Sequence, residues 1–198
     1  MDQQSNLGRI QIVLVDTQDG ANIGSTCRAM KTMGITRLVL VGQREYDENR
    51  VRTLALHASD VWDNAKRFPT LKQALADSVL SVAATRRRGK FRKDCAQSPA
   101  QLADTVMKTG EGLVSIVFGR ESDGLTDDEV AECSLVVTIP TSDQFPSLNL
   151  SQAVQIITFT LFDTIKTYPV EANPVTQDRC EKAALASCEA LDGIGYFK

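Results

Sequence analysis

The sequence predicts an α/β protein in which a parallel sheet is covered by helices on both faces. Five short runs rich in valine, isoleucine and leucine recur along the chain, separated by segments with helical spacing of apolar residues. The runs are apolar without interruption, which is typical of strands buried on both sides. Such strands alternating with helices indicate a parallel sheet, because each crossover helix packs on one of its faces.

The predicted elements follow one another in that alternating order. Strands are expected at residues 10–15, 37–42, 79–85, 113–119 and 135–140. Helices are expected at residues 22–33, 48–57, 70–77, 98–109 and 126–132. A further helix over 147–166 is apolar almost all round, so it should be buried or lie in an interface.

The C-terminal segment is predicted to lie outside the main domain. Pro169 and Pro174 indicate a loop, and residues 176–193 have the pattern of a helix that ends at Gly193. One helix cannot bury a core of its own. We therefore expect one domain over residues 1–168, followed by a linker and a short C-terminal helical extension over 169–198.

The composition argues against several classes of protein. No run of the 198 residues approaches the roughly 18 apolar residues of a membrane span, and the first residues lack an apolar signal core. We therefore expect a cytoplasmic protein without a membrane partner. None of the five cysteines forms a CxxC pair, which indicates neither a zinc site nor a disulfide framework. His57 is the only histidine, so no metal is expected and a metal-dependent hydrolase is disfavoured.

Charge is segregated along the chain. The formal net charge is −3, yet six of the 22 basic residues fall within Arg86 to Lys93, in the run RRRGKFRK. Such a run is either a solvated surface loop or an electrostatic footprint for a phosphate backbone. The residues alone leave both interpretations open.

Ligands of an open α/β sheet bind beside the carboxyl ends of its strands, so the loops there should carry the chemistry. The first strand is followed by DTQDGANIG, which matches neither GxGxxG nor GxxxxGK[ST]. A dinucleotide-binding fold, a P-loop enzyme and a Rossmann-type methyltransferase are therefore disfavoured.

The first candidate segment is ANIGSTCRAMKTMG, residues 21–34. Helical spacing places Arg28 with Ser25 and Thr32 on a polar stripe, away from the apolar side chains. Asn22 suits an N-cap, because its side-chain oxygen can accept from a free amide of the first turn. Taken alone, the segment is either a capped surface helix with a solvated arginine or a site in which that arginine binds a ligand.

Two later loops are candidates as well. In FGRESDGLTDDEV, Gly119 permits close approach of a ligand, and Thr126 with Glu129 forms a capping-box pattern. Glu121 is either part of a structural ion pair or cap, or the group that fixes an arginine such as Arg28. In FPSLNLSQA, free amides at the start of an apolar helix can bind a polar ligand as readily as a cap.

Together these three loops resemble a known family. The SPOUT class of RNA methyltransferases has three ordered motifs similar to N-x-G-x-x-x-R-A-M-K-T-M-G (residues 22–34), F-G-R-E-x-x-G-L-T (118–126) and P-S-L-N-L-x-Q-A (146–153). The likeness covers roughly residues 8–166 and is greatest to the TrmJ/LasT-like tRNA/rRNA ribose 2′-O-methyltransferases of the SpoU–TrmH branch. It implies a deep trefoil knot in the C-terminal half (the SPOUT fold), a homodimer, and S-adenosylmethionine as the methyl donor.

The resemblance also implies roles for particular residues. The donor would lie against strand ends and the last loop, with a leucine packed on its adenine, at Ala84, Thr85, Arg86, Gly119, Ile139, Pro146, Ser147, Leu148 and Asn149. The catalytic group would consist of Arg28, Asn22 and Glu121, facing a pocket completed by the other protomer. The basic run would bind RNA, with its phenylalanine stacked on an unpaired base, at Arg87, Arg88, Lys90, Phe91, Arg92 and Lys93.

The implied reaction is transfer of the sulfonium methyl group to a ribose 2′-hydroxyl, which requires no metal. A guanidinium holds its proton too tightly to act as a base, so we expect Arg28 to hold the adjacent phosphate and stabilise the developing alkoxide. The RNA implied most directly is tRNA, at an anticodon-loop cytidine or uridine. The alternatives are rRNA as substrate, methylation of a base, and a knotted RNA-binding or assembly protein that does not methylate.

Overall fold

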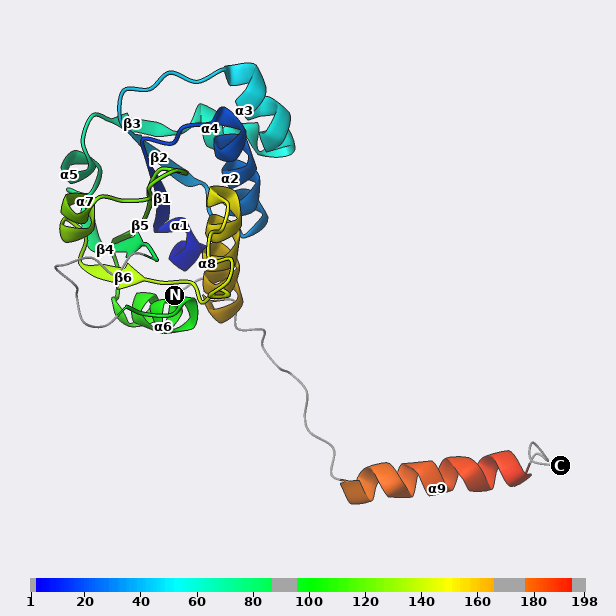
Figure 1. The fold of residues 1–198 in the computed structure, drawn as a ribbon. Helices are drawn as coiled ribbons and strands as arrows, with labels where there is room; N and C mark the ends of the chain where they lie inside the picture. Colours follow the sequence, from blue (N-terminus) through cyan, green and yellow to red (C-terminus); the bar gives the residue numbers. More distant parts are fainter. Residues whose placement is uncertain (1–2, 87–95, 166–176, 194–198) are drawn as a thin grey trace. The chain divides into compact units, whose positions relative to one another are not determined.

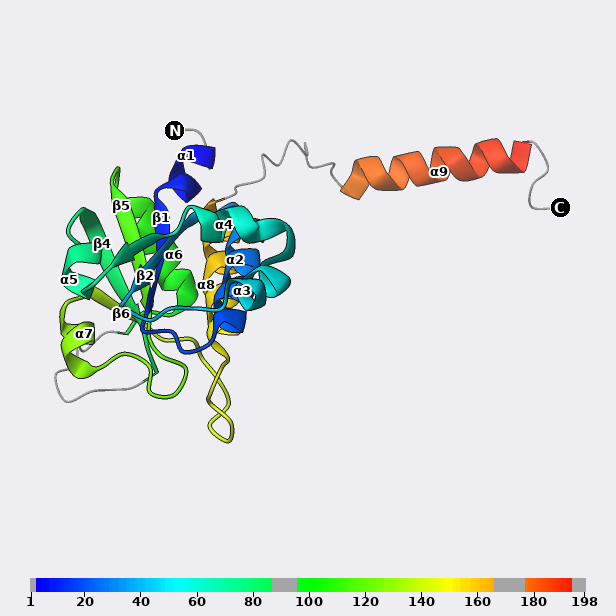
Figure 2. The ribbon, with the colours of Figure 1, turned by 90° about the horizontal axis from the view of Figure 1, so that it is seen from above.

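The computed structural model, shown in Figures 1 and 2, describes residues 3–86, 96–165 and 177–193. The chain divides into two compact units, Met1–Thr167 and Tyr168–Lys198. The first unit contains the sheet. In the second, the described element is α9 (Gln177–Gly193), which agrees with the helix predicted over residues 176–193.

The sheet has six strands that pair in parallel throughout. They are β1 (Ile10–Val15), β2 (Arg37–Val41), β3 (Lys66–Phe68), β4 (Ser78–Ala84), β5 (Leu113–Phe118) and β6 (Leu135–Val137). Their order across the sheet is β3-β2-β1-β5-β4-β6, so β1 is central and pairs with β2 and β5. The predicted parallel α/β sheet is confirmed, although β6 ends three residues before the predicted strand does.

The sequence pattern missed β3, a short strand at the edge of the sheet beside β2. Its residues KRF include two exposed basic side chains. An edge strand is open to solvent on one side and can carry charge, so it lacks the uninterrupted apolar run by which the buried strands were found. The pattern also missed α1 (Gln3–Gly8), a single N-terminal helix of six residues.

Helices cover both faces of the sheet, as predicted (Figures 1 and 2). One face carries α2 (Gly20–Thr32), α3 (Glu48–Ala55), the 3-10 turn η1 (Leu56–Ala58), α4 (Ser59–Asp63), α6 (Pro99–Lys108) and α8 (Leu150–Ile165). The other carries α5 (Leu71–Ala74) and α7 (Asp127–Ala131). Successive residues of β1 point to opposite faces, so Ile12 joins the larger core cluster and Val13 the smaller one.

The N-cap of the helix α2 lies three residues earlier than the predicted cap. This N-cap is Asp19, whose carboxylate accepts from the amide of Ala21, and Asn22 lies within the first turn. The expectation of an Asn22 cap is therefore wrong, which leaves that side chain available for other contacts. Gly24 is buried where α2 packs against α3. A glycine is needed there, because a Cβ would collide with the backbone carbonyl of Val51.

The helix α8 begins at Leu150, three residues later than predicted, and packs against α2 and α6. One side of it is buried, including Val154, Ile157 and Leu161. The other side leaves Phe159 53% exposed and Ile156 36% exposed. The helix is thus apolar on more of its circumference than this unit covers.

The connection between β4 and α6 lies on both sides of β6. Where it leaves β4, the Thr85 amide donates to the Val137 carbonyl over 3.0 Å. Where it returns, Gln97 lies on the opposite edge of β6, and the Thr138 amide donates to its carbonyl over 2.9 Å. The chain therefore leaves β6 between Thr85 and Gln97, which lie at the two ends of this connection.

Candidate active site

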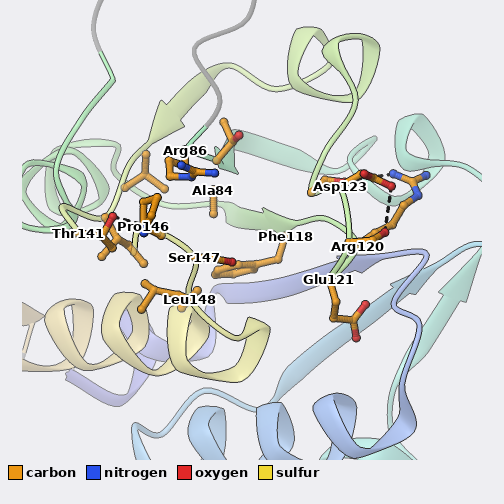
Figure 3. Close-up of a pocket in the computed structure, with 16 residues that line it drawn as sticks. Ala84, Arg86, Phe118, Arg120, Glu121, Asp123, Thr141, Pro146, Ser147 and Leu148 are labelled. Carbon is orange, nitrogen blue, oxygen red and sulfur yellow. Dashed lines mark hydrogen bonds between the residues drawn. The ribbon is translucent and has the colours of Figure 1, made fainter. Parts of the chain in front are cut away.

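A pocket lies at the carboxyl ends of β4, β5 and β6 (Figure 3). The pocket is open to solvent, and its empty volume of about 830 Å³ includes part of that solvent. Apolar side chains from the strand ends and the last loop surround it, among them Ala84, Phe118, Ile139 and Leu148. Polar groups of Thr85, Ser147 and the residues 120–124 complete the lining.

Seven of the nine residues predicted to hold a methyl donor line this pocket, namely Ala84, Thr85, Arg86, Ile139, Pro146, Ser147 and Leu148. The other two, Gly119 and Asn149, do not. A Cβ at Gly119 would collide with the backbone of Gly124 and Leu125, so the fold of its own loop requires a glycine there. Phe118 and Thr141 line the pocket without having been predicted.

The loop over residues 119–126 is closed by Arg120. Its amide and carbonyl pair with the backbone of Gly124, which has the left-handed φ of +70° that favours glycine. The guanidinium donates to both oxygens of Glu129 over 2.9 and 3.0 Å and to Asp16 Oδ2 over 2.7 Å. The capping box predicted for Thr126 and Glu129 is present, so Glu129 binds both the cap and the arginine.

The pKa values of this cluster are shifted by its contacts. The hydrogen bonds that Arg120 donates to Glu129, opposed by partial burial, raise the pKa of Arg120 further above its ordinary value. Burial alone would raise the pKa of Glu129, but hydrogen bonds from Arg120 and the Thr126 amide outweigh it and lower that pKa. The carboxylate and the guanidinium are therefore both charged across the neutral pH range. The sequence pattern does not indicate the role of Arg120, because Asp16 is distant in sequence and Glu129 was assigned only to the capping box.

Glu121 contacts the segment that precedes α2. Its carboxylate accepts from the amide of Gln18 over 2.8 Å, from the amide of Asp19 over 3.3 Å and from Asn22 Nδ2 over 2.8 Å. It makes no ion pair with Arg28 in the described part of the chain, contrary to one of the two interpretations of its sequence. Glu121 instead orients the loop before α2 and the side chain of Asn22.

Asn22 also binds the third motif. Its Oδ1 accepts from Asn149 Nδ2 over 2.9 Å. Asn149 caps α8, because its own Oδ1 accepts from the amide of Ser151, and the Gln152 side chain accepts from the Asn149 amide. Glu121, Asn22 and Asn149 thus form a continuous chain of hydrogen bonds that joins all three motifs.

Arg28 is exposed on α2, on a stripe with exposed Thr32 and half-buried Ser25. It makes no hydrogen bond or ion pair with any residue that the structure describes. On its two sides α2 packs against α3 and α8. The guanidinium is therefore free for a ligand or for a second molecule.

Several other predictions concern groups away from the pocket. Arg86 is exposed at its rim, whereas the predicted RNA-binding residues 87–93 lie outside the described ranges. His57 is exposed, and its carbonyl accepts from Lys31 Nζ. The described residues contain no cluster of histidine, cysteine, aspartate or glutamate that could hold a metal ion. None of the helices in the described ranges is long and apolar enough to span a membrane.

A pocket at the carboxyl ends of parallel strands is typical of enzymes built on an open α/β sheet. The chain matches the SpoU rRNA Methylase family model over residues 9–159. This chain therefore belongs to the SpoU rRNA methylase family.

Two curated relatives show how far the likeness extends. The chain is 37% identical over 155 residues to the tRNA (cytidine-2′-O-)-methyltransferase TrmJ of Methanocaldococcus jannaschii, covering 77% of this chain and 67% of that protein. It is 35% identical over 189 residues to the tRNA (cytidine/uridine/adenosine-2′-O-)-methyltransferase TrmJ of Pseudomonas aeruginosa, covering 93% and 72%. The chain spans about two thirds of the length of the curated relatives it matches.

Solved structures share the fold. A probable methylase family protein from Haemophilus influenzae superposes with a TM-score of 0.77 at 32% identity, covering 96% of this chain and 81% of that one. The SpoU methyltransferase AviRb from Streptomyces viridochromogenes, in complex with AdoMet, has a TM-score of 0.60 at 17% identity, covering 77% and 56%. The second likeness is one of fold alone.

Proposed function

We propose that this protein transfers the methyl group of S-adenosylmethionine to a ribose 2′-hydroxyl of tRNA, at an anticodon-loop cytidine or uridine. The observation that carries the proposal is the junction of the three motifs beside the pocket, where Glu121, Asn22 and Asn149 are hydrogen-bonded in series. The activities of the TrmJ relatives support both the reaction and the choice of tRNA.

The pocket suits S-adenosylmethionine in the character of its walls. Leu148, Ile139 and Phe118 provide an apolar surface for the adenine ring. Polar groups of Thr85, Ser147 and the loop over residues 120–124 can hydrogen-bond the adenine edge, the ribose and the methionine end. When bound, the donor supplies the electrophilic methyl group, so no metal is needed for the transfer.

Arg28 is the residue that we assign to the RNA side of the reaction. The 2′-hydroxyl must be aimed at the methyl group and must lose its proton, and a guanidinium can stabilise the negative charge that develops on its oxygen. It can also hold the adjacent phosphate through two parallel hydrogen bonds. The absence of a described intramolecular partner leaves Arg28 available for both tasks. Asn22 and Glu121 act as positioning residues for the start of α2.

A homodimer accounts for the surface around Arg28. The Arg28 side chain is exposed on α2, and α8, which packs against α2, exposes Ile156 and Phe159. Exposed apolar side chains on a packed helix are typical of a protein interface. We propose that a second copy covers them and that each Arg28 serves a pocket that the partner completes.

The deep trefoil knot of the SPOUT fold also belongs to the proposal. The chain that leaves β6 has Thr85 on one side and Gln97 on the other, which are the two ends of one connection. Threading of the segment after β6 through this connection accounts for both contacts. We further propose residues 1–168 as the cytoplasmic methyltransferase domain, residues 169–198 as a linker and helical extension, and residues 87–93 as an RNA contact.

The test of the function is to incubate the protein with labelled S-adenosylmethionine and total RNA from a strain that lacks the gene, and then to map the labelled nucleoside. A 2′-O-methylated cytidine or uridine in tRNA is the expected product. Label in rRNA, or on a base, would identify one of the alternative substrates. RNA binding without saturable donor binding would mean a protein that does not methylate.

The role of Arg28 has a matched control in Arg52, which is also an exposed arginine on a neighbouring helix. Arg28→Ala should lower the methylation rate at least ~100-fold, the size of a lost transition-state contact. Since Arg28 has no described partner, the free energy of unfolding of the variant should remain within ~0.5 kcal/mol of that of the wild type, and the donor affinity of the variant should be unchanged. Arg52→Ala should methylate normally. Full turnover by Arg28→Ala would contradict the assignment.

A further inference from the structure

The described arginines divide into those that the fold uses and those that it leaves free. In residues 3–86 and 96–165, most guanidinium groups are engaged, as when Arg9 donates to the Val106 carbonyl and Arg50 donates to Asp19. Only Arg28, Arg44 and Arg86 have side chains without a hydrogen bond, ion pair or ring contact to a described residue. Two of these three already belong to the proposed active site. The third, Arg44, has no role in it so far.

Arg44 lies in the loop over residues 42–47, which joins β2 to α3 and which we name the Arg44 loop. The Tyr46 hydroxyl pins this loop by donating to the Thr17 carbonyl over 2.8 Å. The Arg67 guanidinium is stacked 5.8 Å from the Tyr46 ring centroid and 5.1 Å from that of Trp62. The end of the loop is held by Asp47, which caps α3. The contacts of Tyr46 and Asp47 thus fix the backbone of the Arg44 loop, while the Arg44 side chain remains exposed.

The Arg44 loop adjoins the segment that supports the active site. Thr17 accepts from the Tyr46 hydroxyl, and the next residue, Gln18, donates its amide to Glu121 over 2.8 Å. Figures 1 and 2 show the loops after β1 and β2 side by side at the same end of the sheet. Residues 17 and 18 therefore lie between the loop over residues 119–126, which contains Glu121, and the Arg44 loop, and they contact both.

We propose that Arg44 binds a backbone phosphate of the RNA substrate, next to the nucleotide that enters the pocket. The inference rests on the proposed function. An RNA strand with its ribose at the pocket, extended across the segment before α2, meets the Arg44 loop. An exposed guanidinium that no described carboxylate binds is well suited to a phosphate. The loop is already held in place, so the contact costs little ordering of backbone.

The structure also selects Arg44 among the basic residues of this surface. Arg50 is occupied by Asp19, at 2.7 and 2.8 Å, and Arg52 is occupied by Asp63, at 2.7 Å. A phosphate at either would have to displace a carboxylate. Glu45, the neighbour of Arg44, is exposed and carries the opposite charge, so it opposes the same phosphate.

The test measures tRNA affinity of the full chain between 50 and 200 mM KCl by fluorescence anisotropy. Each phosphate contact adds about 0.7 to 0.9 to the slope of log affinity against log salt, so over this range it contributes about a threefold change in affinity. The slope for Arg44→Gln should be smaller by about 0.7 to 0.9, whereas the control Arg52→Gln should keep the wild-type slope. Glu45→Gln should bind tRNA more tightly than the wild type. Donor affinity should be the same in all four proteins.

The outcomes separate this inference from the proposed function. A wild-type slope in Arg44→Gln, with tRNA methylation by the unaltered protein intact, would overturn the role of Arg44 alone. An equal loss of slope in Arg52→Gln would overturn it as well, because the effect would then be one of net charge. A wild-type protein that binds no tRNA would overturn both proposals.

Discussion

The clearest structural prediction concerns Arg120, which closes the loop beside the pocket. Arg120→Met keeps the aliphatic stem and removes the guanidinium. Two charge-assisted hydrogen bonds to Glu129 are then lost, at 2.9 and 3.0 Å, and the Glu129 side chain is only 17% exposed. The pair with Asp16 counts for little, because that carboxylate is 41% exposed.

The expected size follows from these contacts. Hydrogen bonds to charged groups contribute about 1.5–3 kcal/mol each, but the two bonds share one pair of partners and do not add fully. We expect a loss of about 3 kcal/mol in the free energy of unfolding at pH 7. For a protein of this size that corresponds to a Tm lower by about 6–12 °C. Donor affinity should fall too, because the loop lines the pocket.

The same prediction has a pH signature. The pKa of Glu129 is lowered in the folded state, mainly by the bonds from Arg120 acting against burial. Its stabilisation is therefore present above the pKa of an unfolded glutamate, about 4.3, and is lost as the pH falls through the lower folded pKa. The gap in Tm between the wild type and Arg120→Met should thus shrink at pH 3.

Thermal unfolding followed by circular dichroism at pH 7 and pH 3 provides the measurement. Arg52→Met is the matched control, since its ion pair with Asp63 joins side chains that are 42% and 48% exposed. Such a pair contributes at most about 1 kcal/mol. Equal shifts in the two variants, or a gap for Arg120→Met that persists at pH 3, would refute the reasoning.

Three further predictions follow from single contacts. Gly119→Ala should lower the Tm measurably, because the added Cβ collides with the backbone of its own loop, and an unchanged Tm would contradict that geometry. Burial raises the pKa of Cys27 to about 12, so in the native protein at pH 8 a thiol reagent should label exposed Cys188 and not Cys27, as peptide mass spectrometry can check. Asn149→Asp should retain the cap of α8 but lose the donor to Asn22, so a methylation assay should show a slower rate at nearly wild-type stability, whereas Asn149→Ala should also lose about 1 kcal/mol.

Elements that depend on local chemistry were predicted well from the residues. The buried strands β1, β2, β4 and β5 were found to within about one residue at each end, because burial on both faces requires an uninterrupted apolar run. The capping box of Thr126 and Glu129 was also found, since its two residues are three apart. Seven of the nine residues that the family resemblance implied for the methyl donor line the pocket, at the strand ends and in the last loop.

Contacts between distant residues were beyond the sequence pattern. Asn22 and Asp19 are both suitable caps, and α2 uses Asp19. The side chain of Asn22 is instead bound by Glu121, 99 residues away, and by Asn149, 127 residues away. The local sequence pattern does not distinguish a side chain that caps a helix from one that forms hydrogen bonds with residues distant in sequence.

The sequence by itself determined the class of sheet and the order of its buried strands along the chain, because hydrophobic burial acts over a few residues. It also contained the three motifs that resemble the family. Only the tertiary structure decided that a Cβ at Gly119 would collide with its own loop and that Arg120 closes that loop. It also decided that Asp19 binds Arg50, whereas no described residue binds the side chain of Arg28 or Arg44. A charged side chain has the same local pattern whether it is paired or free. Its state depends on which carboxylates the packing of the sheet and helices brings within hydrogen-bond distance.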